Sequence, residues 1–554
     1  MNKFLVADGM EIKKKSDIPM SAMWTPGSLG RGDNESIGYQ ADIKESASVA
    51  HIYGQNLVAA ESMTALGNTW AYSPERLKRT ADMEMAMGLN RFVIHTSVHQ
   101  PSDEKFPGLG LGPFGQWFTR HETWAEQAKP WTSYLTRSCY MLQQGKFVAD
   151  VLYYYGEDNN ITSLFKDKLP DIPKGYNYDF INSDALINVL TVIDGKLETP
   201  SGMQYRVLVL DENAKKMSLP VIKKIRDLVR AGATVTGIKP EMTPSLSDNV
   251  EEFRAIVKEV WESNYKSVST NQMKMNSLES LESVLQKLKI EPDFNYTKTD
   301  EKTEVLYVHR KLVNQDIYWV NNRNDRVEDI EGSFRIIGKT PELWNPQTGE
   351  SKKLSYKIEN GRTIIPLHLE TWDAYFIVFK EATKLANCIV PKTSEKQILQ
   401  IETPWSVSFQ AGRGAPANAT FTTLKSWTEN VDLGIKYFSG TAIYKNTFTV
   451  PSSEKGIYEI DLGEVKNLAE VIINEKSQGI VWKKPFKVEL KDALKIGENS
   501  IEIKVINLWV NRLIGDQQSD VKSKITYTTM PFYKADSPLL PSGLMSPVKL
   551  ILKN

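Results

Sequence analysis

The first part of the chain alternates short apolar segments with helical patterns, and this alternation constrains the fold more than any other feature. A strand that ends at Glu61 is predicted by NLVAAES, and a strand that ends at His95 by RFVIH. A helix between them is predicted by SPERLKRTADMEMAMGL, with Ser73 as its N-cap. Strands that alternate with helices in this way form parallel sheets. We therefore expect an α/β fold here.

A second helix is expected over residues 125–144, and FVADVLYYYGED predicts a further strand that ends near Glu157 and Asp158. Glu61, His95 and Glu157 would then stand together at the carboxyl ends of strands, where (β/α)8 barrels carry their active sites. Residues 1–160 are therefore predicted to be the C-terminal part of a (β/α)8-like catalytic barrel. A complete barrel takes about 200–250 residues, so we expect its N-terminal strands to be missing.

Three further domains are predicted along the chain. Residues 176–300 combine buried strands with amphipathic helices, as in a Rossmann-like domain, but lack the GxGxxG fingerprint of a dinucleotide site. Residues 301–382 hold short strands separated by Asn, Gly and Asp turns, typical of a small β-sandwich. Residues 398–554 predict a jelly-roll β-sandwich. The predicted fold class is therefore α/β plus all-β, in several domains.

Charge and composition exclude several classes of partner. Among the 554 residues, 68 Lys and Arg balance 68 Asp and Glu, so net charge does not draw the chain to nucleic acid or an anionic membrane. No apolar segment reaches the roughly 20 residues of a membrane helix, and the start of the sequence lacks the apolar centre of a secretory signal. Cys139 and Cys388 are too few for a disulfide framework. We expect neither a nucleic-acid nor a membrane partner.

Glu61 is the strongest catalytic candidate among the carboxylates. A carboxylate that follows an apolar strand can be partly desolvated and so suited to acid or base catalysis. Glu157 and Asp158 follow another strand and could supply a second carboxylate, although a solvated turn is the simpler interpretation. The absence of GxSxG, P-loop and Cys/His patterns gives no support to ester hydrolysis or phosphoryl transfer.

The loop after His95 carries the candidate substrate-binding residues. His95, His99 and Gln100 could donate hydrogen bonds to hydroxyl groups, and the two histidines alone do not predict zinc. Further along, GQWFTRHETW offers an aromatic wall with a charged partner for a sugar: Trp117, Arg120 and Trp124. The alternative is a loop that its tryptophans anchor in the protein.

Several motifs in order resemble glycoside hydrolase family 106. They are ASVAHIYGQNLVAAES, RFVIHTSVHQP, YMLQQGKFVADVLYYYGED, YFSGTAIYKNTF and NLWVNRLIGD, and the resemblance extends over almost the whole chain. It implies an α-L-rhamnosidase that hydrolyses terminal rhamnosyl linkages of plant or bacterial polysaccharides with inversion, using two carboxylates. It also implies a last domain similar to galactose-binding-like modules.

The resemblance assigns the general base to Glu61 and places the general acid upstream of the segment where this chain begins. It implies a calcium ion that contacts the sugar, whereas an organic cofactor is not expected. Family members often carry an acidic residue where this chain has Ala22, which cannot coordinate calcium. Asp17, Glu157 or Asp158 could replace it, or the metal site could be lost.

The expected partner is an oligo- or polysaccharide, and the family is expected in the periplasm or outside the cell, although this sequence shows no signal peptide. Two alternatives stay open. The chain could be a catalytically inactive carbohydrate-binding or truncated relative, or a glycosidase for a different sugar, because a fold does not fix the substrate. The sequence does not predict linkage specificity or oligomeric state.

Overall fold

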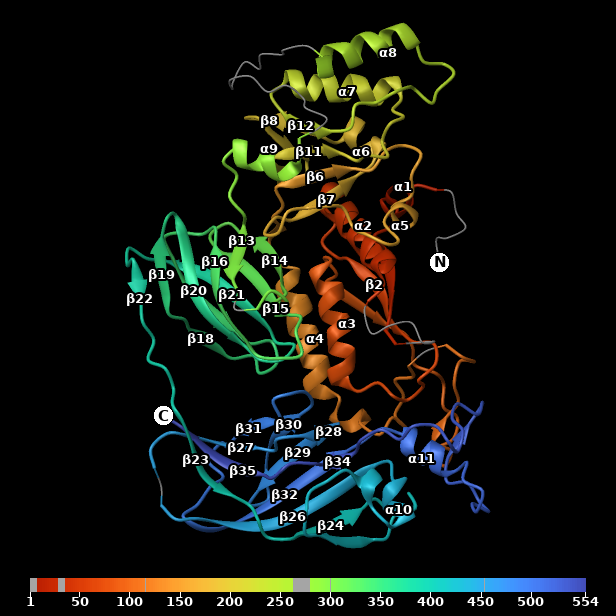
Figure 1. Ribbon diagram of the computed structural model, residues 1–554, viewed down its shortest axis with the longest axis vertical. Helices are drawn as coiled ribbons and strands as arrows, with labels where there is room; N and C mark the ends of the chain where they lie inside the picture. Colours follow the sequence, from red (N-terminus) through yellow and green to blue (C-terminus); the bar gives the residue numbers. More distant parts are fainter. Residues whose placement is uncertain (1–6, 28–34, 115, 263–278, 299, 453) are drawn as a thin grey trace.

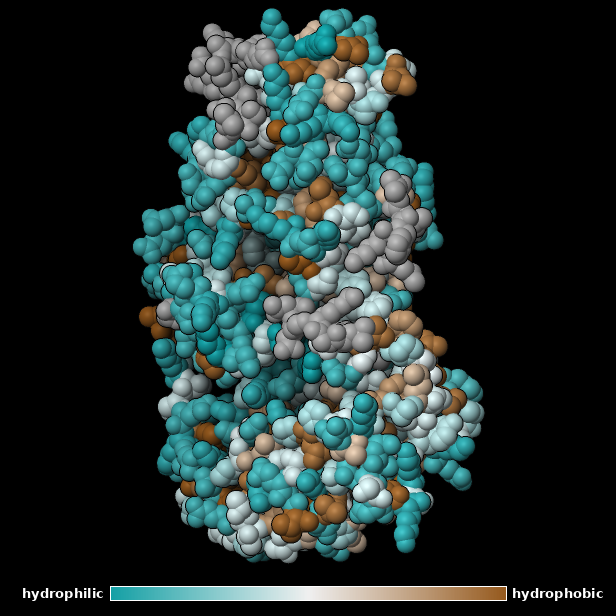
Figure 2. Space-filling model, turned by 45° about the vertical axis from the view of Figure 1, so that its right-hand side comes forward, coloured by the Kyte–Doolittle hydropathy of each residue, from teal (hydrophilic) through white to brown (hydrophobic). Residues whose placement is uncertain are grey.

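The structure is a computed structural model that describes residues 7–27, 35–114, 116–262, 279–298, 300–452 and 454–554. Parallel sheets and helices occupy the upper part of Figure 1, and two groups of antiparallel sheets lie beside and below them. The face seen in Figure 2 is mostly hydrophilic, and its hydrophobic residues form small separate groups. None of the described helices is both long and apolar enough to cross a membrane.

The first sheet is parallel and has the strand order β1 (Met20–Trp24), β2 (Ala59–Thr64) and β3 (Arg91–Ile94). Helices α2 (Ile37–Tyr53) and α3 (Pro74–Ala86) pack on it, and α4 (Lys129–Leu142) packs on α3. Ser73 caps α3 as predicted, since its side chain accepts a hydrogen bond from the backbone N–H of Arg76. Within the described residues this sheet does not close into a barrel. The α/β prediction is thus confirmed at the level of a parallel sheet with helices.

The strand β6 (Val151–Tyr154) belongs to a second parallel sheet, with the order β12 (Thr234–Gly237), β11 (Val207–Leu210), β6 and β7 (Tyr178–Ile181). The prediction that Glu157 shares a sheet edge with Glu61 and His95 is therefore wrong. All four residues of β6 are buried, as in a strand covered on both faces. Apolar patterning identifies such a strand but does not reveal which sheet it joins. The predicted helix and strand after β11 are confirmed as α7 (Leu219–Arg230) and β12.

Helix α2 joins the two parallel sheets, because it packs on β1 and on β7. Its inner face carries a buried polar network in which Nδ1 of His51 lies 2.9 Å from Oδ1 of Asp179 on β7. Tyr205 donates to the other oxygen of Asp179 at 2.9 Å. The hydrogen bonds satisfy groups that would otherwise be costly to bury. The network holds α2 in place between the sheets.

The middle of the chain forms two antiparallel sheets around an aromatic core that includes Phe294, Tyr318 and Phe334. One sheet has the order β13 (Phe294–Thr297), β16 (Glu328–Phe334), β20 (Arg362–Leu369), β19 (Tyr356–Glu359) and β22 (Asn387–Cys388). The other has the order β18 (Ser351–Lys353), β17 (Lys339–Trp344), β21 (Ala374–Ala382), β15 (Asp316–Asn322), β14 (Val305–Lys311) and β5 (Lys146–Phe147). Through β5, the segment before β6 is hydrogen-bonded to this part of the chain.

The last part forms another pair of antiparallel sheets around a separate core. One sheet has the order β23 (Glu395–Gln400), β35 (Lys549–Lys553), β27 (Ile457–Asp461) and β31 (Lys487–Glu489). The other has the order β25 (Asn418–Phe421), β24 (Trp405–Phe409), β26 (Thr441–Val450), β32 (Gly497–Ile506), β29 (Leu468–Ile473) and β30 (Lys476–Val481). The short helix α11 (Val510–Gly515) follows β32.

Candidate active site

Glu61 stands on the face of the first sheet that the helices leave uncovered. Its register neighbours are Ala22 on β1 and Val93 on β3. Met20 and Val93 on this face are 42% and 43% exposed, whereas Ser62 and other residues of the opposite face are buried. We call the exposed or half-buried residues Met20, Ala22, Glu61, Arg91 and Val93 the open face. The half-buried carboxylate of Glu61 is thus accessible to a ligand.

An irregular backbone follows Glu61 directly. Strand β2 continues to Thr64, three residues past the predicted end, and Met63 has a φ of 70°. The register with β1 shifts at this point, and the hydroxyl of Thr64 donates to Oε1 of Glu61 at 3.0 Å. A left-handed methionine costs about 1–2 kcal/mol, and such strained residues collect at functional sites. Sequence analysis missed this feature because methionine carries no turn signal.

A second carboxylate, Glu84 on α3, lies against the opposite face of β2. The hydroxyl of Ser62 donates to its Oε2 at 2.5 Å, and Glu84 is completely buried. Burial raises the pKa of Glu84 well above its ordinary value, which favours the protonated form. Because Ser62 and Glu61 point to opposite faces of the strand, Glu84 supports the sheet and does not reach the open face.

The predicted substrate-binding residues His95, His99 and Gln100 lie in three different environments. His95 follows β3, its backbone N–H donates to the carbonyl of Ser62 at 2.9 Å, and its Nδ1 is buried without a partner in the described part of the chain. His99 is exposed. Gln100 is buried and holds the loop, since its amide donates to and accepts from the backbone of Leu109, each at 2.8 Å. Only His95 is therefore tied directly to the strand that carries Glu61.

The predicted aromatic wall is not formed. Trp117 is completely buried, its Nε1 donates to the carbonyl of Phe114 at 2.8 Å, and its ring packs edge-on against Trp70. Trp124 is 2% exposed and packs against other aromatic rings. Neither indole offers a free face to a sugar, so the alternative of a loop anchored by its tryptophans is the one observed. Arg120 lies at the surface, 2.6 Å from Asp103.

The end of the chain packs against this loop, which sequence analysis did not predict. Nε1 of Trp509 donates to the carbonyl of His121 at 2.8 Å, and the hydroxyl of Tyr533 donates to the carbonyl of Thr69 at 2.7 Å. The strand β33 (Tyr527–Thr528) pairs with β4 (Pro107–Gly108) in parallel. Contacts between segments some 400 residues apart leave no local pattern in a sequence. Residues after β32 thus hold the loops that follow β2 and β3 in place.

Glu122 is the carboxylate of this loop with the most perturbed environment. It is completely enclosed, and its partners are neutral: Nε2 of Gln116 donates to it at 3.1 Å and the N–H of Thr123 at 3.0 Å. Burial raises its pKa to about 8, although these hydrogen bonds act in the opposite direction. Glu122 therefore holds a proton near neutral pH.

The described residues near Glu61 do not fit a calcium ion. Calcium takes 6–8 oxygen ligands, whereas the register neighbours Ala22 and Val93 have no side-chain oxygen. No group of three or more His, Cys, Asp or Glu side chains converges anywhere in the described ranges. The proposed substitutes lie elsewhere: Glu157 accepts from Ser218 and Asp158 pairs with Lys216, beyond the second sheet, while Asp17 is exposed. We route no catalytic step through calcium.

Comparison with known proteins identifies the family of the chain. The family model described as alpha-L-rhamnosidase matches residues 1–358, more than half of the chain. The chain is thus of the glycoside hydrolase class, and it belongs to glycoside hydrolase family 106, as the resemblance implied. A solved rhamnosidase structure from Novosphingobium sp. PP1Y superposes with a TM-score of 0.92 and 42% identity, covering 99% of this chain and 52% of that protein.

A curated relative from Formosa agariphila carries the name "Putative beta-glucuronidase". It is 26% identical, and the match covers 98% of this chain and 66% of the relative. The chain therefore spans about half the length of the Novosphingobium protein and about two thirds of the Formosa protein.

Proposed function

We propose that this chain carries the general base of an α-L-rhamnosidase that hydrolyses terminal α-L-rhamnosyl linkages of oligo- or polysaccharides with inversion. The observation that carries the proposal is the position of Glu61: it is accessible on the open face, oriented by Thr64 and followed by the strained Met63. The oriented carboxylate would accept a proton from the attacking water. His95, half-buried beside the same strand end, would contact a sugar hydroxyl with the accessible part of its imidazole.

An inverting hydrolase also needs a proton donor, about 6.5–9.5 Å from the base. Glu61 is the only acidic residue in β1, β2 and β3, so these strands do not supply the donor. We propose that the general acid lies outside β1, β2 and β3, on another segment that covers the open face. The length of the relatives is consistent with such a segment.

We further propose that the first sheet is part of a (β/α)8-type barrel, that the second is the sheet of a Rossmann-like domain, and that the last sandwich is a galactose-binding-like jelly roll. The parallel order of the first two sheets and the two-sheet packing of the last part support this description. Action in the periplasm or outside the cell is proposed from family membership alone.

The proposal is tested by hydrolysis of an aryl α-L-rhamnoside. Glu61→Gln keeps an acceptor for the Thr64 hydroxyl but cannot act as a base, so turnover should fall about 10²–10⁴-fold. Glu126→Gln, a change of an exposed carboxylate, is the matched control and should leave turnover unchanged. Equal activity of the two variants would exclude Glu61 as the base. NMR of the first-formed sugar anomer tests inversion, and parallel assays with a chelator test for dependence on calcium.

A second candidate function is carbohydrate binding without turnover. It is favoured by the single carboxylate of the first sheet and by Ala22 beside it. Rhamnoside binding by calorimetry, with no product release from folded protein, would support this function. Activity restricted to β-glucuronides would instead replace the proposed sugar, in line with the name of the Formosa relative.

A further inference from the structure

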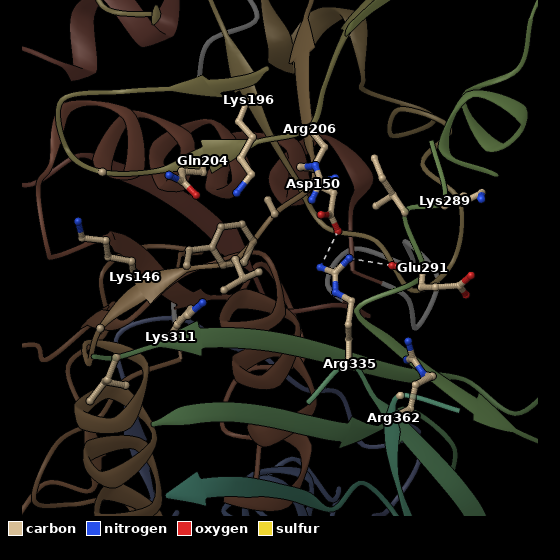
Figure 3. Close-up of a pocket in the computed structure, with 18 of the residues that line it drawn as sticks. Lys146, Asp150, Lys196, Gln204, Arg206, Lys289, Glu291, Lys311, Arg335 and Arg362 are labelled. Atoms are coloured by element: carbon tan, nitrogen blue, oxygen red, sulfur yellow. Dashed lines mark hydrogen bonds and ion pairs between the residues drawn. The ribbon is translucent and has the colours of Figure 1, made fainter. Parts of the chain in front are cut away.

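A cavity of about 820 Å³ opens away from the first sheet, and its lining is strongly cationic. It lies between the hairpin of β9 (Lys196–Glu198) and β10 (Gln204–Tyr205), the start of β6, the end of β14 and the turn before β20 (Figure 3). Seven basic side chains line it, against only Asp150 and Glu291: Lys146, Lys196, Arg206, Lys289, Lys311, Arg335 and Arg362. The chain as a whole is neutral, so this excess of positive charge is local.

Few of these cations are neutralised by the protein. Arg335 pairs with Asp150 at 2.9 Å and lies 3.6 Å from Asp293. Arg362 donates only to neutral oxygens, among them the hydroxyl of Ser333 at 2.6 Å and the carbonyl of Pro292 at 2.7 Å. The other five basic residues make no side-chain hydrogen bond or ion pair within the described ranges. Four of the seven thus have no anionic partner within the described ranges, namely Lys146, Lys196, Lys289 and Lys311, whereas Arg206 is attracted by Asp150, and Arg362 by Asp293 and Glu291.

The geometry suits a ligand with more than one anionic group. Figure 3 shows Lys196 extending down from the strand above the cavity, while Lys311 and Arg335 rise from the strands below it. Like charges gathered in this way repel each other, and an anion that bridges them relieves the repulsion. The guanidinium of Arg335 is already held by Asp150, so the cavity is shaped in advance.

The remaining lining is suited to sugar rings. Leu312 and Val313 add apolar surface beside the cations, while Phe147 and Ile290 are nearly buried in the wall behind them. A mixture of apolar contacts with a few oriented charges is typical of ligand sites, and the volume falls within their usual range of about 300–1,000 Å³. Inorganic phosphate or sulfate alone would leave most of this space and its apolar surface unused.

We propose that this cavity is a second, non-catalytic glycan site that binds an acidic oligosaccharide through its carboxylate or sulfate groups. The choice of a glycan over other polyanions rests on the proposed function, whereas the choice of an anion rests on the cavity alone. The site would hold an acidic part of a polysaccharide while a terminal sugar occupies the open face at Glu61.

The test measures binding, using calorimetry with the full chain carrying Glu61→Gln so that no substrate is consumed. The probes are tetragalacturonate, a sulfated tetrasaccharide, a neutral tetrasaccharide and inorganic sulfate. At least one acidic oligosaccharide should bind, more weakly in 0.5 M salt than at low salt because charges contribute to the affinity. The neutral oligosaccharide should bind at least about tenfold more weakly.

The matched variants remove two charges each. Lys196→Gln with Lys311→Gln should weaken binding of the acidic oligosaccharide by about tenfold or more. Lys425→Gln with Lys476→Gln, two exposed lysines of the last sandwich, changes net charge equally and should leave binding unchanged. Equal losses in both pairs, no binding of either acidic oligosaccharide, or equally tight binding of inorganic sulfate would each overturn the proposal. A failed rhamnosidase assay would not affect this result.

Discussion

Replacing Glu122 by glutamine should stabilise the folded protein relative to the wild type. This difference in stability should grow as the pH rises from 4.5 to 8. The carboxyl group is enclosed among neutral groups, and burial raises its pKa to about 8. In its protonated form it can donate to the amide oxygen of Gln116, which has no partner in the described part of the chain, once that amide turns over. The amide of a glutamine at 122 can make the same hydrogen bonds and never ionises. The variant therefore removes the titration while keeping the contacts.

The size of the effect follows from the two pKa values. In the unfolded chain the carboxyl titrates near 4.5, and in the folded protein near 8. The folded state therefore binds the proton more tightly. The stability that the protonated carboxyl group of Glu122 contributes is fully present below pH 4.5. It falls as the pH rises between the two pKa values and is lost above pH 8. At about 1.36 kcal/mol per pH unit, the total loss is about 5 kcal/mol, of which about 3 kcal/mol is lost by pH 6.5.

Thermal unfolding followed by tryptophan fluorescence between pH 4.5 and 8.5 measures this difference, since Trp124 lies two residues away. Relative to the wild type, Glu122→Gln should unfold at about the same temperature at pH 4.5. At pH 6.5 it should unfold about 3 °C higher, since 554 residues at about 2.1 cal/mol/K each give an unfolding entropy of about 1.2 kcal/mol/K. Glu126→Gln, at an exposed position of the same loop, should follow the wild type throughout. If Glu122→Gln and the wild type gave parallel curves, the carboxyl would not be buried in its neutral form and our reasoning would be refuted.

Three further results are expected. Lys483→Met should destabilise the protein by about 3–5 kcal/mol in urea unfolding, because it leaves Asp373 buried without the ammonium group 2.7 Å away. Restored stability on adding Asp373→Asn would show that the unpaired charge is the cause. Burial lowers the pKa of His309, but the carboxylates of Asp293 and Asp316 more than offset this effect, so the net pKa is raised. His309→Gln should therefore cost most stability below pH 6.5 and less at higher pH. A loss of stability that does not depend on pH would contradict this. The apolar residues of the open face should cause concentration-dependent self-association, which a monodisperse monomer in sedimentation would exclude.

The sequence was sufficient to predict those elements that local patterns define. Ser73 and the apolar spacing behind it specify α3, and the apolar segment Val207–Leu210 specifies β11. The assignment of β6 to the wrong sheet has a physical cause. A strand buried on both faces has no alternation, so nothing in its residues distinguishes one parallel sheet from another. Burial predicts a strand, but only pairing between distant segments determines its neighbours.

The candidate site was predictable in part. The position of Glu61 on a strand of the first sheet was predictable from the apolar segment that contains it, whereas its catalytic role stays a prediction. Trp117 and Trp124 were ambiguous because an indole suits a sugar site and a core equally well, and only contacts with Trp70, Trp131 and Phe118 decide between them. The left-handed Met63 and the cationic cavity could not be predicted, since one depends on strain and the other on residues from six separate segments.

The packing of Trp509 against the loop after β3 and of Tyr533 against the loop after β2 has a consequence for how the domains of this chain can be exchanged. The last sandwich and the segment that follows β32 are not a separate attachment, because they supply hydrogen bonds to His121 and Thr69. Exchanging them for another module of the same shape would leave those carbonyls and the indole of Trp117 exposed. A substitute for the C-terminal part would therefore have to reproduce these contacts with the loops of the first sheet.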